Sequence, residues 1–341
     1  MNRTASIKDV ANHASVAVGT VSNVLNYPDR VSQRTKERVL RAIDELGFVR
    51  NDAARQLRAG HSRTIGLIVL DVGNPFFTSV VRAAEDAAAL QGSAVLLGDS
   101  GHDAGREANY IDLFQEQRVQ GLLISPVGDV TERLDLLRER GVPTVLVDRL
   151  ADEDRFSSVS VDDDAGGYLA ARHLLDLGRR KLAFVGGPLS IRQVSDRLLG
   201  ARRAVAEVDG AALEVLDSDG QSVLAGRGVG NSLVERGAGN MPDGIFCAND
   251  LLALGVMQSL TMMNGVRIPD DVALIGYDDI DFAVSAVVPL SSIRQPTDAI
   301  GRTAIELLTE ELDAQHARHR AVVFTPELVV RQSTAGPEAP H

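Results

Sequence analysis

From Thr64 onward, short apolar segments alternate with longer segments of helical periodicity. The apolar segments predict strands at residues 65–71, 94–99, 121–127, 144–148, 181–186, 213–217, 245–247 and 272–276. The segments between them predict helices at residues 76–90, 106–118, 131–140, 165–177, 195–208, 222–236 and 249–263. Such alternation is typical of parallel sheets with right-handed crossovers and helices on both faces.

These strands are more than one sheet holds comfortably, so we expect two α/β lobes that separate near residues 159–162. A late segment is expected to return to the first lobe. The expected N-lobe comprises about residues 64–161 and 292–321, and the expected C-lobe about residues 162–291 and 322–337. Ligands of such sheets bind beyond the carboxyl ends of the strands, and a cleft between two lobes is a natural pocket.

Polar residues follow several of the predicted strands, among them Asn74, Asp148, Asn249 and Asp278. A carboxylate or an amide can bind two hydroxyl groups at once, and a nearby guanidinium offers a planar fork of donors. This combination suits a polyhydroxylated ligand. Asp71, Asp250 and Asp279 occupy similar positions, but for these three a structural role as helix N-caps is at least as good an interpretation.

The first sixty residues predict three short helices with a tight turn between the first two, at 7–13, at 18–25 and between Ser32 and Gly47. Ser6 and Asp9 form the pattern of a capping box at the start of the first helix. Val39, Ile43 and Leu46 form the buried stripe of the third. Three short helices of this kind predict a helix-turn-helix.

Charge is distributed unevenly between this head and the rest of the chain. Residues 1–63 contain eleven Lys or Arg against six Asp or Glu, a net charge of +5, whereas the remaining residues carry −17. A basic head on an acidic body is typical of a protein in which only the head contacts nucleic-acid phosphates. A solvated charged face is the alternative interpretation.

The second helix leaves Val18, Gly19 and Asn23 on a face that its apolar stripe does not use. A helix this slim can enter the major groove of DNA. Small three-helix cores also occur in protein-interaction modules, so this pattern by itself favours DNA without excluding a protein partner.

Five segments of the chain resemble, in order and spacing, the LacI/GalR family of bacterial transcription regulators. They are SIKDVANHASVAVGTVSNVLN, VSQRTKERVLRAIDELGF, NDAARQLRAG, RTIGLIVLDVGNPFF and LIGYDDI. The resemblance extends over roughly residues 5–334. It implies an all-α helix-turn-helix DNA-binding head at residues 1–50, and a hinge helix with its linker at 51–63. It further implies a two-lobed α/β effector-binding and dimerisation domain, like type 1 periplasmic binding proteins, at 64–337.

The resemblance also implies a function. A homodimer would bind a near-palindromic operator in double-stranded DNA, acting most simply as a repressor. A small effector, a sugar or sugar derivative, would close the cleft between the lobes, rotate them and alter the distance between the hinges. Release of DNA by the ligand is common among sugar-responsive members, whereas purine-type members tighten, and the sequence leaves both responses open.

The residues implied to contact DNA are Val18, Gly19, Thr20, Ser22, Asn23, Asn26, Arg55 and Leu57. The segment from Asn51 to Gly60 is too short to be a stable helix alone, and in the family it folds when two copies meet on DNA. Leu57 matches a leucine that enters the minor groove and kinks the duplex. Without the resemblance, a leucine buried under a linker is the preferred interpretation of Leu57.

Three positions depart from the family pattern. Asn23 stands where an arginine is usual, Ala17 replaces the usual N-cap serine of the second helix, and Arg50 replaces a proline before the hinge. Arginine favours guanine and asparagine favours adenine, so we expect the outer operator bases to differ from those of relatives.

The residues implied to contact the effector are Asn74, Phe76, Phe77, Asp148, Arg197, Asn249 and Asp278. Phe76 and Phe77 are expected at the mouth of the cleft, where they would stack on a ring face. Many sugar-responsive members carry an aromatic residue in the segment that here spans 217–223, and this chain has none there. The floor of the pocket is therefore expected to be open or small.

We expect no catalytic residues, no metal site and no cofactor. The GDSG segment at 98–101 resembles a protease nucleophile loop, but that context needs disulfides and Cys247 is the single cysteine. A Walker A sequence and an HExxH motif are absent. His316 and His319 lie three residues apart with no third ligand in view, so surface histidines are the better interpretation.

The apolar runs are far shorter than a membrane helix, and the N-terminus lacks the pattern of a secretory signal. One cysteine also fits a reducing compartment, so we expect a cytoplasmic, nucleoid-associated protein without membrane contact. The main alternative is a solute-binding protein for sugar uptake, which would need an export signal and no helix-turn-helix. An α/β enzyme with a regulatory head would need a catalytic constellation that the sequence lacks.

Overall fold

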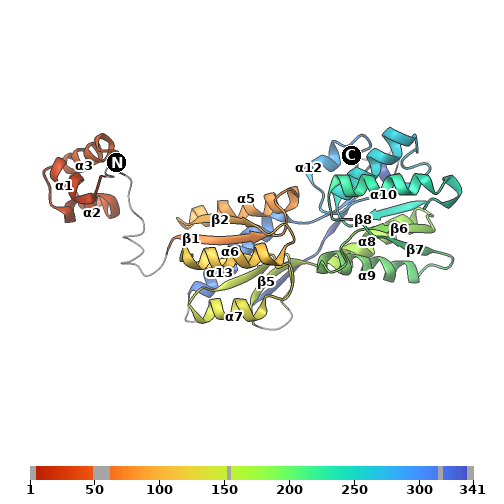
Figure 1. The fold of residues 1–341 in the computed structure, drawn as a ribbon, viewed down its shortest axis with the longest axis horizontal. Helices are drawn as coiled ribbons and strands as arrows, with labels where there is room; N and C mark the ends of the chain where they lie inside the picture. Colours follow the sequence, from red (N-terminus) through yellow and green to blue (C-terminus); the bar gives the residue numbers. More distant parts are fainter. Residues whose placement is uncertain (1–4, 49–61, 152–154, 314–317, 336–341) are drawn as a thin grey trace. The chain divides into compact units, whose positions relative to one another are not determined.

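The computed structural model describes residues 5–48, 62–151, 155–313 and 318–335. These residues form two compact units divided between Ser62 and Arg63 (Figure 1). The predicted hinge helix lies outside the described residues. In the parts of the chain that are described, no helix has the length and apolar character needed to cross a membrane.

The small unit is the predicted three-helix head. Its helices are α1 (Ile7–His13), α2 (Val18–Asn26) and α3 (Gln33–Glu45), with the short 3-10 turn η1 (Pro28–Arg30) before α3. Val10, Val21 and Val39 meet in its core, one from each helix. The predicted capping box is present, since the Ser6 hydroxyl accepts a bond from the Asp9 amide and the Asp9 carboxylate accepts one from the Ser6 amide.

The N-lobe of the large unit is built on a six-stranded parallel sheet of strand order β11-β5-β4-β3-β1-β2. Its strands are β1 (Thr64–Val69), β2 (Ala94–Asp99), β3 (Gly121–Ile124), β4 (Thr144–Val147), β5 (Ser157–Val161) and β11 (Ala321–Phe324). Its helices are α5 (Pro75–Leu90), α6 (Ala104–Glu116), α7 (Thr131–Glu139) and α13 (Thr297–Leu312). Successive strand residues face opposite sides: Leu123 packs with α5 and α13, whereas Leu122 and Ile124 pack with α6 and α7.

The C-lobe contains a four-stranded parallel sheet of order β7-β6-β8-β9. Its strands are β6 (Lys181–Val185), β7 (Ala212–Leu216), β8 (Gly244–Cys247) and β9 (Ala273–Ile275). Its helices are α8 (Asp163–Asp176), α9 (Arg192–Ala206), α10 (Val223–Glu235), α11 (Asp250–Met257), α12 (Asp281–Val284) and α14 (Gln332–Ala335), with the 3-10 turn η2 (Ala238–Asn240) before β8. Figure 1 shows α10 and α9 on opposite sides of this sheet. The helix predicted at 249–263 is α-helical only to Met257 and continues as the π-helical segment η3 (Gln258–Met263).

The late part of the chain crosses between the lobes at points that differ from the prediction. The strand β10 (Ser292–Arg294) pairs with β12 (Glu327–Val329), and Ile293 and Leu328 pack in the C-lobe core. The strand β11 pairs with β5 in the N-lobe sheet. The return to the N-lobe therefore follows β10 and extends through β11, a few residues later at each end than the predicted 292–321.

Two glycines let α8 and α9 approach each other closely. A Cβ atom on Gly200 would overlap the Asp164 carbonyl oxygen, and one on Gly167 would overlap the carbonyl oxygen of Arg197. Because both obstacles are backbone atoms, they cannot move aside as a flexible side chain would. The pairing of these helices brings Arg197 on α9 next to Asp163 on α8.

We expect Gly200→Ala to lower the free energy of unfolding by about 3 kcal/mol, at the upper end of the usual cost of overpacking. Gly228→Ala on α10 is the matched control, because a Cβ there meets no atom within 4 Å. Replacing a helical glycine by alanine at an open position should raise stability by about 0.5–1 kcal/mol. Urea unfolding of both variants measures the difference, and equal effects would contradict the predicted clash.

Candidate functional site

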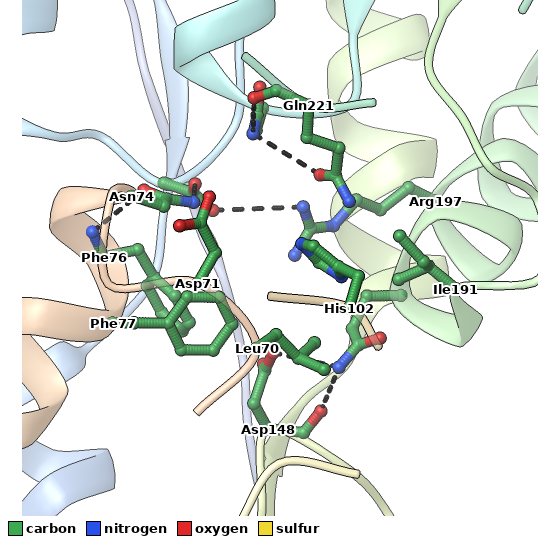
Figure 2. A pocket seen from close by; sticks show the side chains of 13 residues that line it. Leu70, Asp71, Asn74, Phe76, Phe77, His102, Asp148, Ile191, Arg197 and Gln221 are labelled. Carbon is green, nitrogen blue, oxygen red and sulfur yellow. Dashed lines mark hydrogen bonds and ion pairs between the residues drawn. The ribbon is translucent and has the colours of Figure 1, made fainter. Parts of the chain in front are cut away.

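A narrow cavity of about 30 Å³ lies between the two lobes (Figure 2). This volume has room for about two water molecules and is well below that of a small-molecule site, so a ligand would enter as the lobes move apart. All seven predicted effector contacts line it: Asn74, Phe76, Phe77, Asp148, Arg197, Asn249 and Asp278. Residues from both lobes contribute to its wall, as expected for a pocket between the lobes.

Arg197 is held rigidly in the wall of this cavity. Its side chain is only 5% exposed, and it projects from α9 between the two lobes. The Nε atom donates to Asp163 Oδ1 at 2.7 Å, and Nη1 donates to the Ala248 carbonyl oxygen at 2.7 Å. The guanidinium lies over the Tyr277 ring, 3.6 Å from its centroid, an arrangement that favours the cation. Arg197 is thus oriented before any ligand arrives.

The buried charges around Arg197 do not balance. Burial raises the pKa of Asp148, Asp163 and Asp278 above the ordinary aspartate value. Burial also favours neutral arginine, but Asp163 and the other carboxylates outweigh it and raise the pKa of Arg197. Arg197 therefore stays charged while the ionised forms of the three acids are disfavoured, and a further anion in this buried place would be unfavourable as well.

Asp278 lies at a point where the two lobes are joined by hydrogen bonds. Its Oδ2 accepts from Asn74 Nδ2 at 3.0 Å, and its Oδ1 accepts from Gln295 Nε2 at 2.8 Å. The Nη1 atom of Arg197 is 3.9 Å from the same Oδ1. Since Asn74 begins α5 of the N-lobe and Asp278 belongs to the C-lobe, a ligand that competes for either partner changes the link between the lobes.

The backbone at Asp278 and Asp279 is in the left-handed region, with φ of 105° and 57°. Such conformations are unfavourable for residues other than glycine and persist only where neighbouring contacts impose them. Asp250 supplies two of these contacts, accepting from the Ile280 amide at 2.9 Å and from the Ser292 hydroxyl at 2.7 Å.

The interpretation of Asp71, Asp250 and Asp279 as helix N-caps is wrong. The caps of α5 and α11 are Asn74 and Asn249, which accept bonds from the amides of Phe76 and Leu252. The three acids make other contacts instead. Asp71 accepts a hydrogen bond from the Gly73 amide, and Asp250 accepts one from the Ile280 amide. Asp279 forms ion pairs with the arginines at 294 and 331.

Asp148 follows β4 in a left-handed conformation, with φ of 56°. Gln193 Nε2 donates both to its carbonyl oxygen at 2.6 Å and to its Oδ2 at 2.9 Å. The other carboxylate oxygen, Oδ1, is buried and has no hydrogen-bond partner within the described structure. A bound ligand with a hydroxyl group could supply the missing donor.

The cavity wall also contains Asp71, which the sequence analysis considered, and residues that sequence reasoning missed: Leu70, His102, Ile191, Gln193 and Gln221. His102 follows β2, so the argument that selected Asp148 from its position after a strand could also have selected His102. Gln221 comes from the segment that lacks an aromatic residue, and its carbonyl oxygen accepts from Asn249 Nδ2 at 3.0 Å. Phe76 and Phe77 are buried and also belong to the N-lobe core.

In the head, α2 presents the expected face. Val18 is 41% exposed and Gly19 and Asn23 are exposed, whereas Thr20 and Ser22 are half-buried. Ala17 provides no side-chain bond to the start of α2. The side chain of Asn26 and the residues Arg55 and Leu57 lie outside what the structure describes.

We expect Asp148→Asn to raise the free energy of unfolding at neutral pH. Burial and nearby Asp163 raise the pKa of Asp148, so its ionised form is less stable in the folded protein than in the unfolded chain. This penalty is present above the folded pKa and absent below the ordinary aspartate value of about 4, where both states are protonated.

Urea unfolding between pH 4 and 8 tests this expectation. The increase in the free energy of unfolding should be largest at pH 8 and should vanish near pH 4. Exposed Asp176, which pairs with Arg172 on the surface of α8, provides the control Asp176→Asn, for which little change is expected at any pH. A loss of stability in Asp148→Asn at pH 8 would contradict the assigned penalty.

Comparisons with known proteins agree with this architecture. The family profile described as "Bacterial regulatory proteins, lacI family" matches residues 6–51, and that of a "Periplasmic binding protein-like domain" matches residues 171–334. The HTH-type transcriptional repressor PurR of Vibrio campbellii is 34% identical over 336 residues, covering 96% of this chain and 98% of the repressor.

Two solved structures have a similar fold over nearly the whole chain. The lac repressor dimer bound to operator and the anti-inducer ONPF is 26% identical, with a TM-score of 0.82 and coverage of 98% of this chain and 100% of that one. The transcriptional regulator CelR in complex with cellobiose is 30% identical, with a TM-score of 0.71 and coverage of 96% and 99%.

The helix-turn-helix head and the two-lobed domain together define a DNA-binding transcription regulator. The chain belongs to the LacI/GalR family of bacterial transcription regulators. The prediction that it is not an enzyme is confirmed by relatives that are transcriptional repressors. The alternative of a solute-binding protein for uptake is wrong, because residues 6–51 match the regulatory family.

Proposed function

We propose that this protein is a dimeric repressor of a near-palindromic operator, controlled by a sugar or sugar derivative in the inter-lobe cavity. The observation that carries the proposal is the oriented Arg197, fixed between Asp163 and the Ala248 carbonyl in a cavity that Asp148 and Asp278 also line. Guanidinium and carboxylate groups in fixed positions are suited to pairs of neighbouring hydroxyls.

The charge of the cavity supports a neutral effector. Burial already disfavours the ionised forms of Asp148, Asp163 and Asp278, so a phosphate or carboxylate group would add a further anion in a place where water is excluded. A neutral polyhydroxylated molecule can instead donate to the carboxylates and accept from the arginine. The cellobiose complex of CelR, a relative of similar fold, supports a sugar as the ligand class.

Effector control would pass through the bond between Asn74 and Asp278. A ligand that bonds to Asp278 competes with Asn74, whose other amide atom caps the first turn of α5. Movement of α5 relative to the C-lobe then changes the spacing of the hinges and the stability of the DNA-bound state. Measuring operator affinity with and without ligand gives the sign of the response.

The apolar surface of the large unit supports a homodimer. Exposed apolar side chains gather along α10, η3 and α12 at Leu224, Met262, Met263, Phe282, Val284 and Val287. They adjoin a groove of about 410 Å³ lined in part by Leu251, Leu254 and Met257. On the N-lobe, Leu96 and Leu97 are exposed on β2, an edge strand. Surfaces of this kind mark interaction sites, and light scattering at micromolar concentration should show a dimer.

A thermal-melt screen of the purified protein tests the effector. Its panel holds sugars, polyols, sugar phosphates and nucleobases, and a ligand at 100 times its dissociation constant should add about 2.7 kcal/mol to the stability. A neutral sugar whose shift disappears in Arg197→Met supports the proposal. If a nucleobase or a sugar phosphate alone shifts the melt, or no compound does while operator binding persists, the neutral-sugar assignment is wrong.

In the cell, we place the protein in the cytoplasm, associated with the nucleoid.

Asn23→Arg is expected to change the preferred operator base from adenine to guanine at the position that Asn23 contacts. Each bidentate side-chain-to-base pair contributes about 1–3 kcal/mol of discrimination. Competition among operators that differ at single positions measures the change. Asn12→Arg, on the exposed side of α1, adds the same charge and should raise affinity for all sequences alike. An unchanged base preference in Asn23→Arg would contradict the docking of α2 in the major groove.

A further inference from the structure

A second cavity, of about 350 Å³, adjoins the inter-lobe cavity. Asp148 and Gln193 line both. We call the second one the hinge cavity, because the connection from β5 of the N-lobe to α8 of the C-lobe passes along it. This hinge between the lobes is distinct from the hinge helix predicted within residues 51–63. Its further lining includes Leu150, Ser160, Asp164, Arg192, Asp196 and Val323.

Two buried polar atoms belonging to residues that line the hinge cavity lack partners. The Ser160 hydroxyl and Asp148 Oδ1 have no hydrogen-bond partner among the described residues, and the two residues are only 5% and 4% exposed. A buried polar group without a partner costs about 1–3 kcal/mol, and native structures rarely keep one without a reason. A ligand hydroxyl in the hinge cavity could bond to these buried atoms once a neighbouring side chain moves.

Several other charged residues of the hinge cavity, in contrast, already have partners. Asp164 pairs with Arg203, Asp196 with Arg192, and Asp162 caps the Ala165 amide at 2.9 Å. A cation would have to compete with these partners for the carboxylates. The atoms that remain to be satisfied therefore favour a neutral, hydroxyl-bearing group.

Gln193 lies between the two cavities. Its amide nitrogen bonds to the carbonyl oxygen and to Oδ2 of Asp148, and these bonds hold its side chain in the shared wall. Glutamine is unbranched and can take other rotamers once a ligand replaces those bonds. Rotation of this one side chain would join the two cavities.

We propose that the hinge cavity is a second subsite and that the effector is a glycoside of at least two sugar units. This inference rests on the proposed sugar effector. One unit occupies the inter-lobe cavity beside Arg197, and the next occupies the hinge cavity with its hydroxyls bonded to Ser160 Oγ and Asp148 Oδ1. Gln193 moves aside and determines which linkages pass.

Calorimetric titration with matched sugars tests the subsite. The probes are glucose, galactose and xylose, each beside a disaccharide that contains it: cellobiose, lactose and xylobiose. For the sugar that binds, we expect the disaccharide to bind about tenfold more tightly than the monosaccharide, equivalent to about 1.4 kcal/mol.

The variant Ser160→Val removes the hydroxyl and narrows the hinge cavity, so it should abolish this tenfold gain and leave monosaccharide affinity unchanged. Ser160→Ala removes the hydroxyl alone and is the second variant should valine disturb β5. Ser158→Ala is the control, because Ser158 is a buried serine of the same strand whose hydroxyl instead accepts from the Ala151 amide. It should keep the gain.

The outcomes separate the inference from the function on which it rests. If a monosaccharide binds but the disaccharide binds no more tightly, or its gain survives in both Ser160 variants, the second subsite is wrong and the sugar effector stands. If no sugar of either size binds, the proposed sugar effector fails, and the subsite fails with it.

Discussion

Arg197→Met is expected to lose the thermal response to every effector and to lower the free energy of unfolding by about 3–5 kcal/mol at neutral pH. Arg197 is the cation that pairs with Asp163 and lies near Asp278. Its removal leaves buried carboxylates without their charge partner, whereas methionine fills much of the same space. The cost arises from the acids that remain and not from lost packing.

The pH dependence distinguishes this cause from a simple packing defect. Without Arg197, the already raised pKa values of Asp148, Asp163 and Asp278 should rise further. These carboxyl groups destabilise the folded variant when they are ionised, and protonation removes that destabilisation. The deficit relative to the native protein should therefore be largest near pH 8 and shrink toward pH 5.

Arg203→Met is the matched control, since Arg203 is on the same helix and also pairs with an aspartate of α8, Asp164. Its side chain is 52% exposed, so the pair is screened by water and should contribute about 0–1 kcal/mol. Urea unfolding at several pH values, with an effector titration beside it, measures all three proteins. A deficit in Arg197→Met that is independent of pH would contradict the role of the buried acids.

The candidate site could be predicted largely because parallel sheets bring their strand ends together. Asp148, Asn249 and Asp278 are far apart in sequence, yet each follows a strand, and the structure places all three around one cavity. Asp163 was missed because it lies in the first turn of a helix and its pairing with Arg197 depends on how closely α8 and α9 approach. Gln193 was missed for a related reason, since it projects from the first turn of α9.

The strand β5 shows where hydrophobic patterning fails. Its sequence, SSVSV, is too polar to be recognised as a buried strand, yet all its residues are buried. Two of its serine hydroxyls have partners: Ser157 donates to Glu311, and Ser158 accepts from the Ala151 amide. These partners are distant in sequence or lie in a loop, and Ser160 lacks one altogether among the described residues. A buried polar strand of this kind is detectable only once tertiary contacts are known.

Operator affinity is expected to fall by about 10³- to 10⁵-fold as salt rises from 50 to 200 mM, if the dimer contacts about six to ten phosphates. The whole chain carries −12, which alone would predict repulsion from DNA. Binding must then depend on the head, where residues 1–63 carry +5. On α3, Arg34, Arg38 and Arg41 share one exposed face, since they are spaced by four and three residues.

Fluorescence anisotropy with a labelled operator gives the slope of log affinity against log salt concentration, about −0.9 for each phosphate neutralised. Asn23→Ala is the control, because it removes a neutral base-reading group and should weaken operator binding while leaving the slope unchanged. The acidic body should make no favourable contribution, since it carries −17 and is repelled by phosphate at any separation within the Debye length, about 10 Å at 0.1 M salt. A slope near zero would show that the basic head does not bind through phosphates.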